Sequence, residues 1–165
     1  MTKARLIVLA GNPGVGKSFV AKCIQDEVGA VVLETDRIRK ELFPEPTYSG
    51  EESSETYAEL YRRAEEALGR GEVVVLDATF NLKMGRDKAC SIAESFDAGF
   101  DIFHVTCPET VAKKRIRNRT DTLSDADCEV YDIIDGAFEE FTRPVTEIDT
   151  DTTKEVVRES VVEAL

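Results

Sequence analysis

The sequence is poor in residues that bind metals or form disulfides. It has one histidine, His104, and four cysteines at scattered positions, 23, 90, 107 and 128. No two cysteines form a C-x-x-C pair, so the usual zinc-binding and disulfide-framework patterns are excluded. We therefore expect reduced cysteines in a cytoplasmic protein.

Long hydrophobic segments are also missing. No apolar run approaches the roughly 20 residues that a membrane-spanning helix needs. The short apolar run that ends at Leu9 leads into Gly11 and Asn12 without a small-residue cleavage site. We therefore expect neither a secretory leader nor a membrane partner.

Positive charge is scarce. Lys and Arg total 21 against 33 Asp and Glu, which gives a formal net charge of −12. Such a chain repels nucleic acid and anionic membranes at long range, so nucleic acid is not an expected partner. The excess of acidic residues is typical of a protein that needs high solubility, for example in a salty cytoplasm. The alternative interpretation is that the protein binds a basic partner.

The length and the apolar content predict one folded domain over residues 1–165. The chain falls within the range of about 100–200 residues per domain. Its hydrophobic residues make up 42% of the sequence, which is too much for a disordered chain.

Short β-branched runs alternate with longer helical patterns. We predict strands over 5–10, 30–34, 72–77, 100–106 and 144–149, and helices over 17–28, 55–69, 83–96, 108–117, 125–141 and 153–164. Gly29, Gly71 and Gly99 fall between a helix and the next strand, where helix-terminating glycines occur. The alternation predicts βαβ units and a parallel sheet, and the apolar first three strands indicate that both its faces are covered.

Two polar stretches interrupt this pattern. Residues 43–54 contain Pro44, Pro46 and Gly50, and we predict a mobile loop before the helix at 55. Residues 118–124 join two predicted helices and form either a short loop or a closing lid.

A complete phosphate-loop motif, G-x-x-x-x-G-K-[ST], follows the first strand. Its glycines let backbone N–H groups converge on phosphate oxygens, and the helix that it opens favours anions at its N-terminus. Lys17 is expected to reach the β- and γ-phosphates, and the Ser18 hydroxyl to ligate Mg²⁺. The predicted nucleotide-binding residues are Gly11, Asn12, Pro13, Gly14, Val15, Gly16, Lys17, Ser18 and Phe19.

Two acids follow predicted strands at the edge of the sheet where ligands bind. Asp36 follows the second strand and could take a proton from an acceptor hydroxyl, while Arg39 could hold an anionic acceptor. A helix cap with a solvated arginine is the alternative. Asp77 ends the third strand, where a carboxylate holds Mg²⁺ directly or through water, or else caps the following turn. Thr79 could contact substrate, or serve only the turn.

The only dense basic cluster covers residues 113–119 and contains five of the 21 basic residues. A solvated helix face is the usual explanation of such a run. The cluster nevertheless lies beside the polar stretch 118–124, so arginines from it could close on the phosphates and stabilise transition-state charge.

Together these motifs resemble the small P-loop kinases and AAA-type ATP-binding proteins, whose relatives include chloramphenicol phosphotransferase, gluconate kinase, zeta toxins and polynucleotide 5′-kinase domains. The matching segments are the phosphate loop, Thr35-Asp36-Arg37-Ile38-Arg39, Asp77-Ala78-Thr79, and Arg115 to Arg119 followed by Ser124-Asp125-Ala126. The resemblance extends from Leu6 to about Asp149. It implies a three-layer α/β P-loop NTPase fold with a five-stranded parallel sheet in the order 2-3-1-4-5.

The resemblance also implies roles for single residues. Asp36 corresponds to a general base, Arg39 to an acceptor-phosphate clamp, and Arg115 and Arg119 to the arginines of a lid over about 118–128. The sequence departs from the family at Thr122, where an Asp is common.

The function predicted from these residues is transfer of the γ-phosphoryl group of ATP·Mg²⁺ to a hydroxyl of a small-molecule acceptor. Lys17, Asp36, Arg115 and Arg119 are the expected catalytic residues. A polynucleotide 5′-hydroxyl kinase fits Asp36 and Arg39, although the net charge disfavours it. An ATP-binding switch or weak ATPase is the third possibility, and it would leave Asp36 without a purpose. The acceptor and the oligomeric state stay open.

Overall fold

The computed structural model describes residues 3–119 and 128–165. Its strands are β1 (Arg5–Ala10), β2 (Val31–Glu34), β3 (Val73–Asp77), β4 (Gly99–Thr106) and β5 (Thr146–Asp149). Its helices are α1 (Lys17–Val28), α2 (Thr35–Leu42), α3 (Gly50–Gly69), α4 (Lys83–Ser95), α5 (Glu109–Arg117), α6 (Cys128–Gly136) and α7 (Lys154–Ala164).

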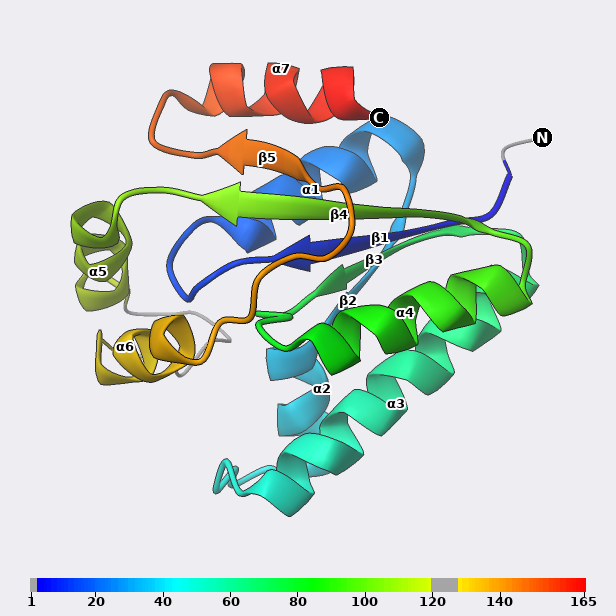
Figure 1. Ribbon diagram of the computed structural model, residues 1–165, viewed down its shortest axis with the longest axis horizontal. Helices are drawn as coiled ribbons and strands as arrows, with labels where there is room; N and C mark the ends of the chain where they lie inside the picture. Colours follow the sequence, from blue (N-terminus) through cyan, green and yellow to red (C-terminus); the bar gives the residue numbers. More distant parts are fainter. Residues whose placement is uncertain (1–2, 120–127) are drawn as a thin grey trace.

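All the strand pairs are parallel, and the sheet order is β2-β3-β1-β4-β5. Helices α1 and α7 cover one face and α3 and α4 the other, whereas α5 and α6 stand beyond the carboxyl ends of the strands (Figure 1). This confirms the predicted P-loop NTPase fold and its strand order.

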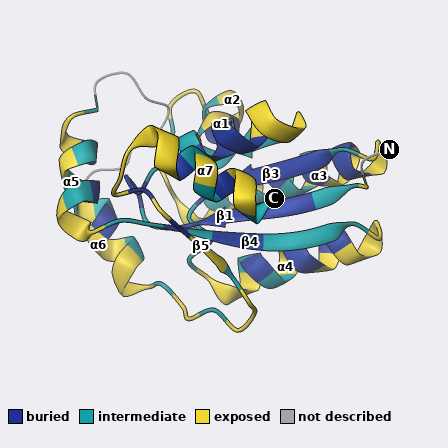
Figure 2. Ribbon diagram, turned by 90° about the horizontal axis from the view of Figure 1, so that it is seen from above, coloured by how far each residue is buried: buried dark blue, intermediate teal, exposed yellow. Residues whose placement is uncertain are grey.

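Central strand β1 lies between two hydrophobic cores. Ile7 and Leu9 face the core shared with α1 and α7, and Leu6 and Val8 face the core shared with α3 and α4. All four residues are fully buried, and Figure 2 shows the central strands of the sheet largely in the colour of buried residues. An unbroken apolar run is therefore what this position requires, because both faces of the strand are covered.

The predicted loop over 43–54 is wrong in its second half, because α3 begins at Gly50. The hydroxyl oxygen of Ser49 accepts a hydrogen bond from the backbone N–H of Glu52 at 3.1 Å and so caps the helix. Ser49 and Glu52 have the S-x-x-E spacing of a capping box, a local signal that marks this boundary.

The predicted helix over 125–141 is also shorter than expected. Helix α6 ends at Gly136, and residues 137–145 form an irregular connecting segment that leads into β5. Residues 120–127, most of the predicted lid and the first turn of that predicted helix, lie outside the described residues.

Candidate active site

The phosphate loop connects β1 to α1 at the carboxyl end of the sheet. The Gly11 N–H donates to the carbonyl oxygen of Thr79 at 3.0 Å, so the loop is joined to the turn after β3. Gly14 has φ 81°, and a Cβ at this position would stand 2.6 Å from the carbonyl oxygen of Ala112. Glycine is therefore required here both by the backbone conformation and by the approach of α5.

Lys17 opens α1 and turns its side chain back over the loop. Its Nζ donates to the carbonyl oxygens of Gly11 at 2.9 Å and Asn12 at 3.0 Å. Burial lowers the pKa of the ammonium group, against the carboxylates of Asp77 and Asp36, which raise it. A desolvated cation held over the loop is suited to phosphate oxygens.

Ser18 and Asp77 meet beside Lys17. The Ser18 hydroxyl donates to Oδ2 of Asp77 at 3.2 Å, and the Asp77 side chain is buried, with 8% of the residue exposed. Burial raises the pKa of Asp77 to about 6, and the neighbouring Glu34 adds to this, whereas Lys17 lowers it. A hydroxyl and a carboxylate are hard oxygen ligands, and this pair fits Mg²⁺, which binds proteins through few side chains together with phosphates.

The raised pKa of Asp77 predicts a pH dependence of stability. The folded value of about 6 exceeds the ordinary 3.8, so the stability that this carboxyl contributes is complete below about pH 4 and is lost as the pH rises through about 6. Such a shift is worth about 3 kcal/mol at most. We expect Asp77→Asn to raise the free energy of unfolding near neutral pH and to leave it unchanged near pH 4, as measured by urea denaturation. An equal change at both pH values would contradict this.

Asp36 lies half-buried in the first turn of α2, directly after β2. Its charge influences the pKa values of both Lys17 and Asp77, so the three groups share one electrostatic environment. Tyr57 from α3 belongs to the same environment: burial raises the pKa of its hydroxyl, and the charges of Asp36 and Asp77 add to this. Carboxylates and hydroxyls thus gather beside the phosphate loop, on the side of β2 and β3.

Arg39 makes a buried ion pair that sequence reasoning missed. Only 8% of Arg39 and 5% of Glu52 are exposed, and Nη1 of the arginine lies 3.1 Å from Oε1 of the glutamate. Burial works to raise the pKa of Glu52, but hydrogen bonds from Thr47, Arg39 and Tyr48 prevail and lower it to about 2. The positive charge of Arg39 is therefore already matched by a carboxylate of α3.

The two expected lid arginines lie in different surroundings. Arg115 joins the phosphate loop to the end of the sheet: it donates to the carbonyl oxygens of Val15 at 3.2 Å and Thr150 at 2.9 Å. Its Nη1 also donates to the Thr150 hydroxyl at 2.9 Å. Arg119 is half-buried, and its charge contributes to the lowered pKa of Lys17, so its guanidinium lies within electrostatic reach of that ammonium group.

Two further residues of the predicted nucleotide-binding set make contacts that the sequence did not predict. The Asn12 side-chain amide donates to Oδ1 of Asp135 in α6 at 2.9 Å, although the two are 123 residues apart. The Phe19 ring of α1 packs against the core, with the cations of Lys154 and Arg158 in α7 at 5.7 and 5.8 Å from its centroid. Because the Phe19 side chain is engaged in these contacts, its backbone N–H is the group of this residue that can bind a phosphate. No local pattern marks Asp135 or Thr150, because their partners are distant in sequence.

Sequence comparison places this site in a known family. A sequence model of AAA domains matches residues 6–141, from β1 through the connecting segment. The chain belongs to the AAA domain family. This confirms the resemblance to small P-loop ATP-binding proteins that the motifs indicated.

Curated relatives of the chain include uncharacterized proteins of Mycobacterium tuberculosis and Mycobacterium bovis. They are 33% identical to the chain in an alignment of 138 positions that covers 76% of this chain and 28% of each relative. The chain thus spans less than a third of the length of these relatives.

Solved structures of similar fold include several kinases. An APS kinase, CysC of Mycobacterium tuberculosis in complex with AMPPNP and APS, superposes with a TM-score of 0.76 at 18% identity, over 99% of this chain and 98% of that one. A gluconokinase of Sinorhizobium meliloti gives 0.72 at 19% identity, over 96% and 90%. Kti12 of Chaetomium thermophilum in complex with ADP-AlF3 gives 0.73 at 18%, over 96% of each chain. At this identity the likeness shows a shared fold.

The membrane prediction can be compared with the helices. Within residues 3–119 and 128–165, none of the helices combines the length and the apolar character needed to cross a membrane.

Proposed function

We propose that this protein is an ATP-dependent phosphotransferase that moves the γ-phosphoryl group of ATP to a hydroxyl of a small-molecule acceptor. One observation carries the proposal: Asp36, a carboxylate outside the phosphate loop, lies in the first turn of α2, two residues after Glu34, whose partner across the sheet is Asp77. A phosphate-loop lysine such as Lys17 serves any ATP-binding protein. A carboxylate at this edge of the sheet additionally serves a reaction in which a hydroxyl loses its proton.

In this proposal, different residues act on ATP and on the acceptor. The loop N–H groups and Lys17 bind the phosphates, and Arg119 counters the negative charge that spreads over the transferred group. Asp36 accepts the proton of the acceptor hydroxyl as the hydroxyl oxygen bonds to the γ-phosphorus and the bond to the ADP oxygen breaks. Ser18 and Asp77 would hold Mg²⁺, which when bound neutralises charge on the β- and γ-phosphates.

Arg115 takes a supporting role in this proposal. Its guanidinium donates to the carbonyl oxygens of Val15 and Thr150 and so joins the phosphate loop to the residue that follows β5. Its charge still contributes to the potential at the phosphates. Because Arg39 is paired with Glu52, the site offers less support for an acceptor phosphate clamped by Arg39, as a polynucleotide kinase would need.

The direct test follows label from [γ-³²P]ATP with a panel of sugars, nucleosides, antibiotics and 5′-hydroxyl oligonucleotides. We expect ADP release that depends on one small-molecule class, with the label in that molecule. Label only in inorganic phosphate, at a rate unaffected by every panel member, would instead favour the ATPase or switch. Label in the oligonucleotide would favour the polynucleotide kinase.

Arg119 provides a test of the proposed phosphate contact. We expect Arg119→Ala to lower turnover about 10-fold to 100-fold and to change ATP affinity much less, because the contact strengthens as charge redistributes in the transition state. Lys114→Ala is the matched control, since Lys114 is an exposed cation of α5. Steady-state kinetics and calorimetric ATP binding measure both effects. If Arg119→Ala behaved like the control, the arginine would be only part of a solvated helix face.

A further inference from the structure

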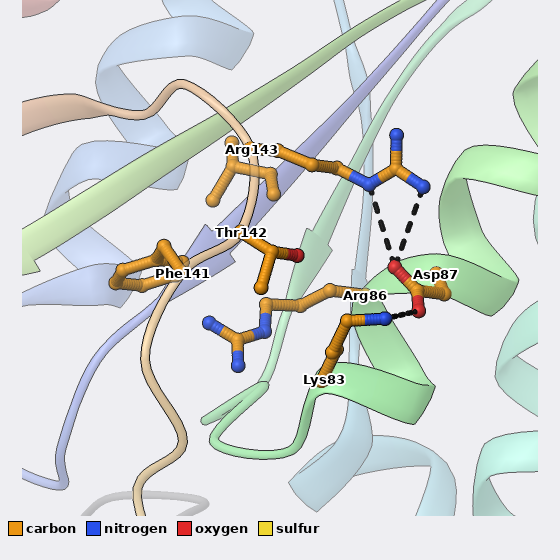
Figure 3. A pocket seen from close by; sticks show the side chains of 7 residues that line it. Lys83, Arg86, Asp87, Phe141, Thr142 and Arg143 are labelled. Atoms are coloured by element: carbon orange, nitrogen blue, oxygen red, sulfur yellow. Dashed lines mark hydrogen bonds and ion pairs between the residues drawn. The ribbon is translucent and has the colours of Figure 1, made fainter.

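A second cluster of charged side chains lies outside the nucleotide site, around a small pocket between α4 and the connecting segment 137–145. On its outer side, Asp87 forms ion pairs with Lys83 at 2.5 Å and Arg143 at 3.3 Å. Arg86 points the other way, toward Phe141 (Figure 3). Adjacent residues of α4 thus face different surroundings: Asp87 forms ion pairs at the surface, and Arg86 is buried in the interior.

Arg86 is buried against the backbone of the connecting segment. Only 3% of the residue is exposed, and its Nη2 donates to the carbonyl oxygens of Glu139 at 2.8 Å and Glu140 at 3.3 Å. Its guanidinium carbon lies 4.4 Å from the centroid of the Phe141 ring and 5.9 Å from that of Phe138. Among the described residues, Nη1 is buried without a hydrogen-bond partner.

Burying an arginine side chain at this position costs free energy, because its charge is removed from water. Burial without a hydrogen-bonded carboxylate disfavours the charged group and lowers the pKa of Arg86. A methionine of similar length would pack between Phe138 and Phe141 with less desolvation. What the guanidinium adds is directed hydrogen bonds, which fix the course of the backbone at Glu139 and Glu140.

The position of that backbone matters because it leads to the phosphate loop. The Glu139 N–H donates to the carbonyl oxygen of Asn81 at 2.8 Å, and Oε1 of Glu139 accepts from the Lys83 N–H at 2.9 Å, at the start of α4. The Asn81 side-chain oxygen accepts from the Thr79 hydroxyl at 3.2 Å. The carbonyl oxygen of Thr79 in turn accepts from the Gly11 N–H at 3.0 Å.

The turn in this chain of contacts is itself strained. Phe80 lies between Thr79 and Asn81, is 2% exposed, and has φ 44°, a left-handed conformation that is uncommon for an aromatic residue. Such a backbone persists only where its neighbours hold it in place. The contacts that do so here include the bond from Glu139 to Asn81, and Arg86 holds Glu139.

We infer that Arg86 is a positioning residue for the phosphoryl-transfer site: through Glu139 and Asn81 it fixes the turn that carries Thr79 and joins Asp77 to the phosphate loop. The inference rests on the proposed function for its kinetic consequence. Its structural consequence, that the turn and the connecting segment are held together through Arg86, is independent of it.

The test compares Arg86→Met and Arg86→Lys with the wild-type protein. Met has a similar volume and removes both side-chain hydrogen bonds, whereas Lys keeps the charge and loses the paired donation to two carbonyls. We expect both to lower turnover about 10-fold to 100-fold while ATP affinity changes less than about 3-fold, because displacement of a reacting group by about 1 Å slows chemistry more than binding. Hydrogen exchange should become faster in peptides covering 78–84 and 137–143.

The matched control is Arg143→Met, which removes another arginine of the same pocket. Arg143 is 42% exposed at its side chain and pairs only with Asp87 among the described residues, so we expect turnover and exchange to stay unchanged. Unchanged exchange in Arg86→Lys would overturn the inference, because the turn and the connecting segment would then not depend on Arg86. ATP affinity and turnover falling in parallel would overturn it in favour of a purely structural arginine. If the wild-type protein transferred no phosphate, the proposed function would fail. Hydrogen exchange would then still test whether Arg86 holds the turn and the connecting segment together. Should Arg86→Met fail to fold, Arg86→Lys decides.

Discussion

Asp36→Asn should lower acceptor phosphorylation by about 10²-fold to 10⁴-fold, the range usual for a general base. Asparagine keeps the shape of the side chain, but it cannot take the proton that the acceptor hydroxyl loses. ATP affinity should change little, because Asp36 lies outside the phosphate loop, after β2. The measurement combines steady-state turnover with calorimetric binding of a non-hydrolysable ATP analogue.

A control for this variant is available on the same helix. Glu41→Gln removes a carboxylate that is half exposed and pairs with Arg63 at 2.8 Å, on the surface of α2 and α3. It should leave turnover unchanged. If Asp36→Asn lost ATP binding and turnover to the same extent, Asp36 would be assigned a structural or metal-binding role instead.

Lys17→Ala should produce the other large effect, a fall of at least about 10²-fold in ATP turnover, as expected when a preorganised cation is removed from a transition state. Affinity for ATP should fall as well, since the ammonium group is aimed at the phosphates in both states. The fold should persist: burial lowers the pKa of Lys17, so the side chain stands where a charge is unfavourable for stability.

Thermal denaturation and nucleotide binding separate these effects. Lys22→Ala, at an exposed position of α1, is the control and should match the wild type in both measurements. Wild-type turnover in Lys17→Ala would mean that residues 11–18 do not bind phosphate.

The parts of the molecule that were predictable are those in which the signal is local. The run Arg5–Ala10, the glycines of the loop and the amphipathic α1 follow one another directly, so strand, turn and helix could be assigned from their order. Asp36 and Asp77 could be placed at the same edge because parallel strands bring their carboxyl ends together. The start of α3 was missed although Ser49 and Glu52 carry the capping signal.

What escaped prediction depends on contacts between distant segments. Arg39 was expected at an acceptor, but nothing in its neighbourhood of the sequence indicates that Glu52 neutralises it. Arg86 gave no signal, since its partners are backbone carbonyls 53 and 54 residues away. The end of α6 at Gly136 likewise depends on the path that the connecting segment takes across α4.

The contact of Thr150 with the phosphate loop has a consequence for the order of folding. The Thr150 hydroxyl donates to the carbonyl oxygen of Val15, 135 residues earlier in the chain, and Arg115 binds both residues. A motif of eight consecutive residues therefore obtains its final curvature from one of the longest loop closures in the chain, and such closures are slow. During synthesis the motif is complete early, yet its fully braced form requires the strand Thr146–Asp149 to have emerged and paired. Full affinity for nucleotide should accordingly appear only after Thr150 has been synthesised, well after the motif itself is complete.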